Sequence, residues 1–149
     1  MDKQEVFDTV CRHLAVQKTR SVFDETVEGT PTDSGPVQKA IRCAYRGTGS
    51  SEGLKCALGC LIPDEEYEAW MEGAGDAMNL LLYMTIYGER AKRAPKILEI
   101  LSKHANLCAK LQLVHDCSET PEEVRVGLNE VARDFNLDPT NADLVTEWK

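Results

Sequence analysis

Apolar residues recur every three or four positions through most of this chain, and that spacing is typical of one face of an α-helix. In residues 2–17, Val6, Val10 and Leu14 lie four positions apart, and Phe7 widens the apolar stripe. This pattern predicts an amphipathic helix over residues 2–17.

Two further periodic segments predict helices in the second half of the chain. Pro95 opens a long one that runs to about residue 116. Residues 120–123, Thr-Pro-Glu-Glu, form a helix start with threonine as the cap, proline at the first position and glutamate three after the cap. The expected core positions of these two helices are Ile97, Leu101, Cys108, Leu111, Val124, Leu128, Val131 and Phe135.

The segments between these helices are less regular. Residues 63–66, Pro-Asp-Glu-Glu, indicate another helix start, because proline suits the first turn and acids suit the positive end of the helix dipole. Residues 76–87 are apolar on nearly every face, which predicts either a central helix or a partner surface. The chain therefore predicts about five helices.

Residues 41–60 predict a β-hairpin followed by a tight turn. The strands are residues 41–46 and 53–58, joined by a polar, glycine-containing loop, and antiparallel pairing places Cys43 opposite Cys56. The expected fold class is α+β and mainly α, with about five helices packed with one two-stranded antiparallel hairpin.

A chain of 149 residues fits one domain. We expect residues 1–137 to form it, with a flexible loop at residues 25–36, where Gly, Pro, Ser, Thr and acids show no period. Residues 138–149 are expected to be an acidic tail, whose one apolar cluster, ending at Trp148, is spaced for a short helix or a docking peptide.

Charge narrows the classes of partner. The chain has 17 basic and 25 acidic residues, a net charge of −8, which argues against direct binding to nucleic acid through its phosphates. Charged residues lie where a signal peptide would be apolar, and the longest apolar stretch, residues 77–87, is too short to span a bilayer. We therefore expect a cytoplasmic protein with no membrane partner.

The charges are also segregated along the chain. Residues 61–76 hold six acids and no Lys or Arg, whereas residues 89–110 hold six bases and two acids. Two interpretations remain open: the basic helix is neutralised by its acidic neighbours, or the acids form a surface that binds a positively charged partner.

The six cysteines offer a metal-binding alternative. If zinc binds, its ligands are Cys43, Cys56, Cys60 and His115. Buried thiols are the favoured interpretation, because structural zinc sites more often show two close-spaced pairs and only one is present here. Residues 115–117, His-Asp-Cys, contain the residue types of a triad, but consecutive helical residues point in different directions. We assign no catalytic residue and expect no cofactor.

Two cationic side chains and a tyrosine beside the glycine-containing loop are candidates for binding an anion or a partner carboxylate. The alternative is that the two cations pair with the acids that follow them. The expected ligand- or partner-binding residues are Tyr45, Arg46, Lys55, Asp64, Glu65 and Glu68.

Three boxes carry a resemblance to a known family. Residues 43–47 read C-A-Y-R-G, residues 55–64 read K-C-A-L-G-C-L-I-P-D, and residues 111–116 read L-Q-L-V-H-D. In this order they resemble a family of small phage and bacterial proteins that share a C-x-Y-R-G turn, a K-C-A-x-G-C-L-I-P-D box and a later L-Q-x-x-H-D stretch. The resemblance implies a phage-like context and no particular mechanism.

These features favour a small acidic protein-interaction module, phage-encoded, that binds and modulates or inhibits a host enzyme or antiviral defence complex in the host cytoplasm. The alternative is a small-ligand, anion or zinc-binding module, or a modest enzyme, centred on the hairpin. A homodimer through the apolar helix or the tail stays open.

Overall fold

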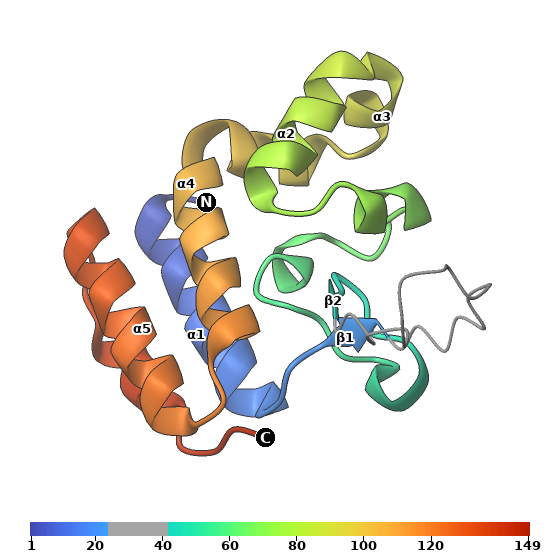
Figure 1. The fold of residues 1–149 in the computed structure, drawn as a ribbon. Helices are drawn as coiled ribbons and strands as arrows, with labels where there is room; N and C mark the ends of the chain where they lie inside the picture. The colour runs from blue at the N-terminus through green and yellow to red at the C-terminus, as the bar shows by residue number, and fades with distance from the viewer. Residues whose placement is uncertain (24–41) are drawn as a thin grey trace, which may run out of the picture.

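The computed structural model describes residues 1–23 and 42–149, and the loop expected at residues 25–36 lies outside them (Figure 1). The described residues are mainly helical. The α-helices are α1 (Lys3–Gln17), α2 (Ala77–Ile86), α3 (Gly88–Arg93), α4 (Pro95–Cys117) and α5 (Pro121–Phe135). Short 3-10 helices lie at Gly49–Ser51, Gly59–Leu61, Ala69–Gly73 and Thr140–Leu144.

Helix α4 is central and packs against α1, α2 and α5 (Figure 1). It kinks at His104, whose backbone is not helical (φ −135°, ψ 22°). Its apolar positions are buried from Ile97 to Leu111, as the period predicts. No side chain of its own caps its first turn, and the buried carboxylate of Glu66 instead accepts the N–H groups of Lys96 and Ile97 at 2.9 and 3.0 Å.

The expected hairpin is wrong, and with it the α+β class. The only β-pairing in the described residues joins two-residue strands, β1 (Val22–Phe23) and β2 (Arg42–Cys43). Residues 53–58, expected to be the second strand, are turns and irregular backbone. The burial pattern of residues 57–62 explains why no strand forms here.

Ala57, Leu58, Leu61 and Ile62 are all buried, a spacing that fits a helical turn better than a strand. The backbone accordingly turns here, with Cys60 N–H donating to the carbonyl of Cys56 at 3.0 Å. The helix expected from Pro63 is likewise a single turn, closed by the Tyr67 N–H on the Pro63 carbonyl at 3.1 Å.

Residues 138–149 do not form a tail separate from residues 1–137. Ala142, Val145 and Trp148 lie three positions apart and are buried, and this segment contacts α1 and α5. The Lys149 N–H donates to the carbonyl of Lys18 at 3.0 Å, so the segment returns to the end of α1 (Figure 1). The domain therefore includes this segment.

Within the described residues, every helix is too short or too polar to cross a membrane.

Candidate functional site

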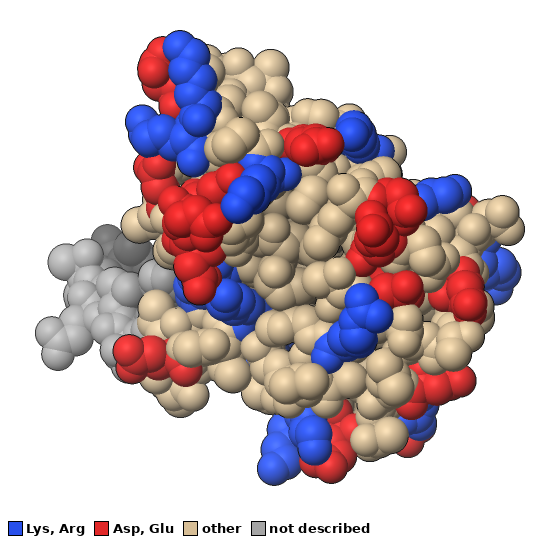
Figure 2. Space-filling view, turned by 180° about the vertical axis from the view of Figure 1, so that it is seen from behind, with Lys and Arg blue, Asp and Glu red and all other residues tan. Residues whose placement is uncertain are grey.

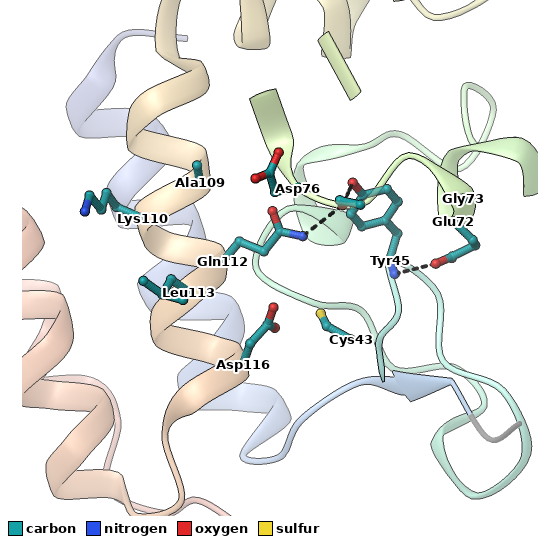
Figure 3. A pocket seen from close by; sticks show the side chains of 11 residues that line it. Cys43, Tyr45, Glu72, Gly73, Asp76, Ala109, Lys110, Gln112, Leu113 and Asp116 are labelled. Atoms are coloured by element: carbon teal, nitrogen blue, oxygen red, sulfur yellow. Dashed lines mark hydrogen bonds between the residues drawn. The ribbon is translucent and has the colours of Figure 1, made fainter. Parts of the chain in front are cut away.

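A cavity of about 690 Å³ opens between three parts of the chain (Figure 3). These are the end of β2 with the segment after it, the end of the 3-10 helix Ala69–Gly73 with the turn that follows, and the C-terminal half of α4. A cavity of this volume is in the range of small-molecule sites. The polar side chains that line it are Tyr45, Glu72, Asp76, Lys110, Gln112 and Asp116.

Gly75 organises one wall of the cavity. Its φ of 87° suits glycine and turns the chain into α2, where Asp76 caps the helix by accepting the Asn79 N–H at 2.9 Å. The Gly75 carbonyl accepts hydrogen bonds from the hydroxyl of Tyr45 and the amide of Gln112. Burial raises the pKa of Tyr45, so its hydroxyl remains a donor.

Gln112 connects this wall to α4. It is only 6% exposed, and its Oε1 accepts the Ala77 N–H at 3.1 Å. Its Nε2 donates to the Gly75 carbonyl at 3.4 Å. The segments around Tyr45, Gly75 and Gln112 are thus fixed to one another by buried hydrogen bonds.

Cys43, His115 and Asp116 form a cluster beside the cavity. Cys43 Sγ lies 3.7 Å and Asp116 Oδ1 2.8 Å from the same ring nitrogen, Nδ1 of His115. The other nitrogen, Nε2, accepts the backbone N–H of Ser21 at 3.1 Å. Because Nε2 must accept that hydrogen bond, the ring proton sits on Nδ1 and is donated to Asp116.

This tautomer opposes nucleophilic catalysis by Cys43. A cysteine nucleophile needs an unprotonated ring nitrogen facing its sulfur, with the orienting acid on the other nitrogen. Here Cys43 and Asp116 share the protonated nitrogen. A hydrogen bond with Cys56, burial and the charge of Asp116 all raise the pKa of Cys43, so its thiol stays protonated.

The same geometry opposes the zinc alternative. Zinc on Nδ1 of His115 would move the ring proton to Nε2, where it would face the Ser21 N–H, which is also a donor. The expected ligands Cys56 and Cys60 make local contacts instead: Cys56 Sγ accepts the Gly59 N–H at 3.2 Å, and Cys60 Sγ donates to the Ala57 carbonyl at 3.1 Å. Burial, first of all, raises the pKa of Cys60. Among the described residues, the group with metal-ligand spacing is Cys43, His115 and Asp116, so the expected set with Cys56 and Cys60 is not assembled.

Thiol reactivity tests the assignment of the cysteines other than Cys117 as unreactive, protonated thiols. Cys117 is the one exposed cysteine of the six, and we expect it alone to react rapidly with Ellman's reagent in the native protein. Burial raises the pKa of both Cys11 and Cys108 to about 12, and the pKa values of Cys43 and Cys60 are also raised. Cys117→Ser should abolish the fast phase, and all other thiols should react only in denaturant. A second fast equivalent in the native protein would contradict the assignment.

Arg46 and Lys55, expected to bind an anion, both pair with Asp64, at 3.0 and 2.7 Å. The Arg46 guanidinium also donates to the carbonyl of Ile62 at 2.8 Å and lies over the ring of Tyr67, 4.8 Å from its centroid. The hydrogen bond and charge of Lys55 lower the pKa of Asp64. The two cations are therefore occupied in fixing the turn at residues 59–64.

Glu65 and Glu68 are also paired, with Lys96 at 2.7 Å and Arg93 at 2.6 Å. On the face of the molecule drawn in Figure 2, acidic and basic side chains lie beside one another. Of the six expected site residues, Tyr45 alone lines the cavity, and the other five lie in ion pairs outside its lining. The acids that line the cavity, Glu72, Asp76 and Asp116, were not expected.

Helix α2 presents a second candidate surface. One side of it, with Leu80 and Met84, is buried, and the helix packs against α4. The opposite side is exposed and mostly apolar, with Asn79 and Thr85 as its polar residues, and α2 lies at the edge of the molecule (Figure 1). Its exposed large residues, together with the one that follows the helix, are Met78, Leu82, Tyr83, Ile86 and Tyr87, and we call them the α2 face.

Comparisons with protein-family models, with curated proteins and with solved structures give no match. The resemblance to small phage and bacterial proteins therefore stays a prediction.

Proposed function

We propose that this chain is a protein-interaction module and that it binds its partner through the α2 face. The observation that carries the proposal is a cluster of five large apolar or aromatic residues left exposed along one helix and its end. Soluble domains rarely leave contiguous apolar patches uncovered, and such patches commonly mark interaction sites. Met78, Leu82 and Ile86 lie four positions apart, the spacing with which a helix presents one row of side chains to a groove or a second helix.

The residues beside the α2 face indicate the partner's charge. Residues 77–88 hold no charged side chain. In α3, which follows them, Lys92 pairs with Glu89 and Arg93 pairs with Glu68, whereas Arg90 is in no ion pair within the described residues. The Arg90 guanidinium lies 4.7 Å from the ring centroid of Tyr87, so a cation adjoins the apolar row. A partner that presents apolar side chains with carboxylates at their edge would complement this surface.

The biological setting that we propose follows from the resemblance. In that setting the chain is phage-encoded, acts in the host cytoplasm and inhibits or modulates a host enzyme or antiviral defence complex. Occupation of a partner's apolar surface by the α2 face is a physical route to inhibition that needs no catalytic residue in this chain.

Ile86→Glu tests the proposal. Ile86 is 63% exposed, so glutamate should leave the fold intact while placing a charge where the partner must exclude water. Val126→Glu is the matched control, because Val126 is 59% exposed on α5, away from the α2 face. We expect a stoichiometric partner to co-purify from host lysate with the wild-type chain and with Val126→Glu. Its affinity for Ile86→Glu should fall by about tenfold or more.

Two further readouts make the experiment decisive. The identified partner should lose activity when the wild-type chain is added and keep it when Ile86→Glu is added. A partner that binds both variants equally would contradict a role for the α2 face. A wild-type dimer that Ile86→Glu converts to a monomer would assign this face to a second copy of the chain and would contradict the proposal of a host partner.

A further inference from the structure

The cavity of Figure 3 concentrates negative charge without ion pairs. Glu72, Asp76 and Asp116 supply three carboxylates to its lining, and Lys110 supplies one ammonium group. Among the described residues, none of these three carboxylates has a Lys or Arg nitrogen within ion-pair distance. In the part of the chain that the structure describes, the one ionisable side-chain nitrogen at that distance from any of them is Nδ1 of His115, beside Asp116. The His115 ring is neutral because its Nε2 accepts the Ser21 N–H.

Neutral donors hold the Glu72 carboxylate in place. It accepts the backbone N–H groups of Tyr45 and Arg46, at 3.0 and 2.9 Å, and the hydroxyl of Tyr67 at 2.8 Å. Three neutral hydrogen bonds orient a carboxylate without cancelling its charge. Glu68, by contrast, has both carboxylate oxygens hydrogen-bonded to the guanidinium of Arg93, which neutralises its charge.

The other two carboxylates are held in the same way. Asp76 accepts the Asn79 N–H at the start of α2, and Asp116 accepts the ring N–H of His115. An ionised carboxylate has about four acceptor positions, so each keeps capacity for a further donor. A cation entering the cavity would not have to displace a lysine or arginine.

We infer that this cavity binds a small organic cation whose head group is an alkylammonium or alkylguanidinium. The lining has a net charge of −2, from three carboxylates and one lysine, which selects against anions. The volume of about 690 Å³ accommodates a small molecule. The Tyr45, Gly75 and Gln112 contacts give the site a preformed wall, which lowers the cost of ordering on binding.

The experiment uses three ligands of similar shape that differ in charge: butylguanidinium, butylammonium and uncharged butylurea. Amide and side-chain NMR signals of ¹⁵N-labelled protein report binding at Gly73, Gly75 and Gln112, which line the cavity. We expect both cations to shift these signals in a saturable way at millimolar concentration. Butylurea should leave them in place.

Asp116→Asn removes one charge from the lining and keeps an oxygen that accepts the His115 proton. It should raise the dissociation constant for both cations by about fivefold. Asp143→Asn is the matched control, because Asp143 is exposed in the 3-10 helix Thr140–Leu144 and changes the net charge equally. It should bind as the wild type does, and so should Ile86→Glu, which separates this site from the α2 face.

Three outcomes would overturn the inference. Saturable shifts by butylurea with the affinity of butylguanidinium would show that shape and not charge governs the cavity. Equal weakening by Asp116→Asn and Asp143→Asn would show a general effect of net charge. Signals of Gly75 and Gln112 that stay fixed at saturating cation would show that the cavity takes no ligand of this class.

Discussion

Replacement of Trp148 by alanine is expected to lower the free energy of unfolding by about 3–5 kcal/mol. Trp148 lies one residue from the end of the chain, yet it is only 7% exposed. Its indole Nε1 donates to the carbonyl of Ser118 at 3.0 Å, and its ring meets that of His115 edge-on, with centroids 5.7 Å apart. The substitution would therefore remove a large buried side chain and expose the region around His115. Chemical denaturation followed by circular dichroism measures the loss.

Two companion variants divide this effect into its parts. Trp148→Phe keeps most of the apolar surface but leaves the Ser118 carbonyl without the indole donor, at a cost of about 1–2 kcal/mol. Lys149→Ala changes the exposed neighbouring side chain and should stay within about 0.5 kcal/mol of the wild type. If Trp148→Ala matched Lys149→Ala, the C-terminal segment would be the separate tail that its charge suggested, and the packing described above would be wrong.

The long helices were predictable because their signals are local. Helix α1 was expected over residues 2–17 and spans Lys3–Gln17, with Asp2 as its cap, and α4 was expected over residues 95–116 and spans Pro95–Cys117. Thr120 caps α5 by accepting the Glu123 N–H at 3.2 Å, as the residue types indicate. Periodicity and caps within one segment decide where such helices begin and end.

The hairpin was predicted wrongly because its decisive contacts are not local. Alternation in so short a run cannot distinguish a strand from a single helical turn. The deciding partners are distant in sequence: Ser21 Oγ donates to the carbonyl of Ala44 at 2.9 Å, and Gln17 accepts the Lys55 N–H at 2.8 Å. Nothing in residues 41–60 alone specifies those partners.

In the candidate site, too, local sequence predicted one part and distant contacts decided the rest. Tyr45 was expected to bind a ligand, from its place beside the glycine-containing loop, and it lines the cavity. Glu72 and Gln112 were missed, although Gln112 lies within the L-Q-L-V-H-D box. A glutamine at a buried position of a long amphipathic helix is itself a signal, because a polar group there needs partners. Its partners, around Gly75, are more than 30 residues away.

Gly59→Ala tests the corrected turn, and we expect it to lower the free energy of unfolding by about 3 kcal/mol. A Cβ added at Gly59 would overlap the carbonyl oxygen and carbon of Tyr45, which are backbone atoms and cannot rotate away. The carbonyl of Gly59 also accepts a hydrogen bond from the Arg46 guanidinium, so movement of residue 59 would disturb the group that fixes the turn to Asp64. Thermal and denaturant unfolding measure the change.

Gly73→Ala is the matched control for the same chemical change. Gly73 has no heavy atom within 4 Å of an added Cβ, and its φ is not positive, so alanine there should lie within about 0.5 kcal/mol of the wild type or stabilise slightly. In the expected hairpin, residue 59 would follow the second strand and would not be pressed against Tyr45. Equal stability of the two variants would therefore favour that arrangement over the turn. A loss confined to Gly59→Ala would tie Tyr45, and with it one wall of the cavity, to the close approach of these two backbone segments.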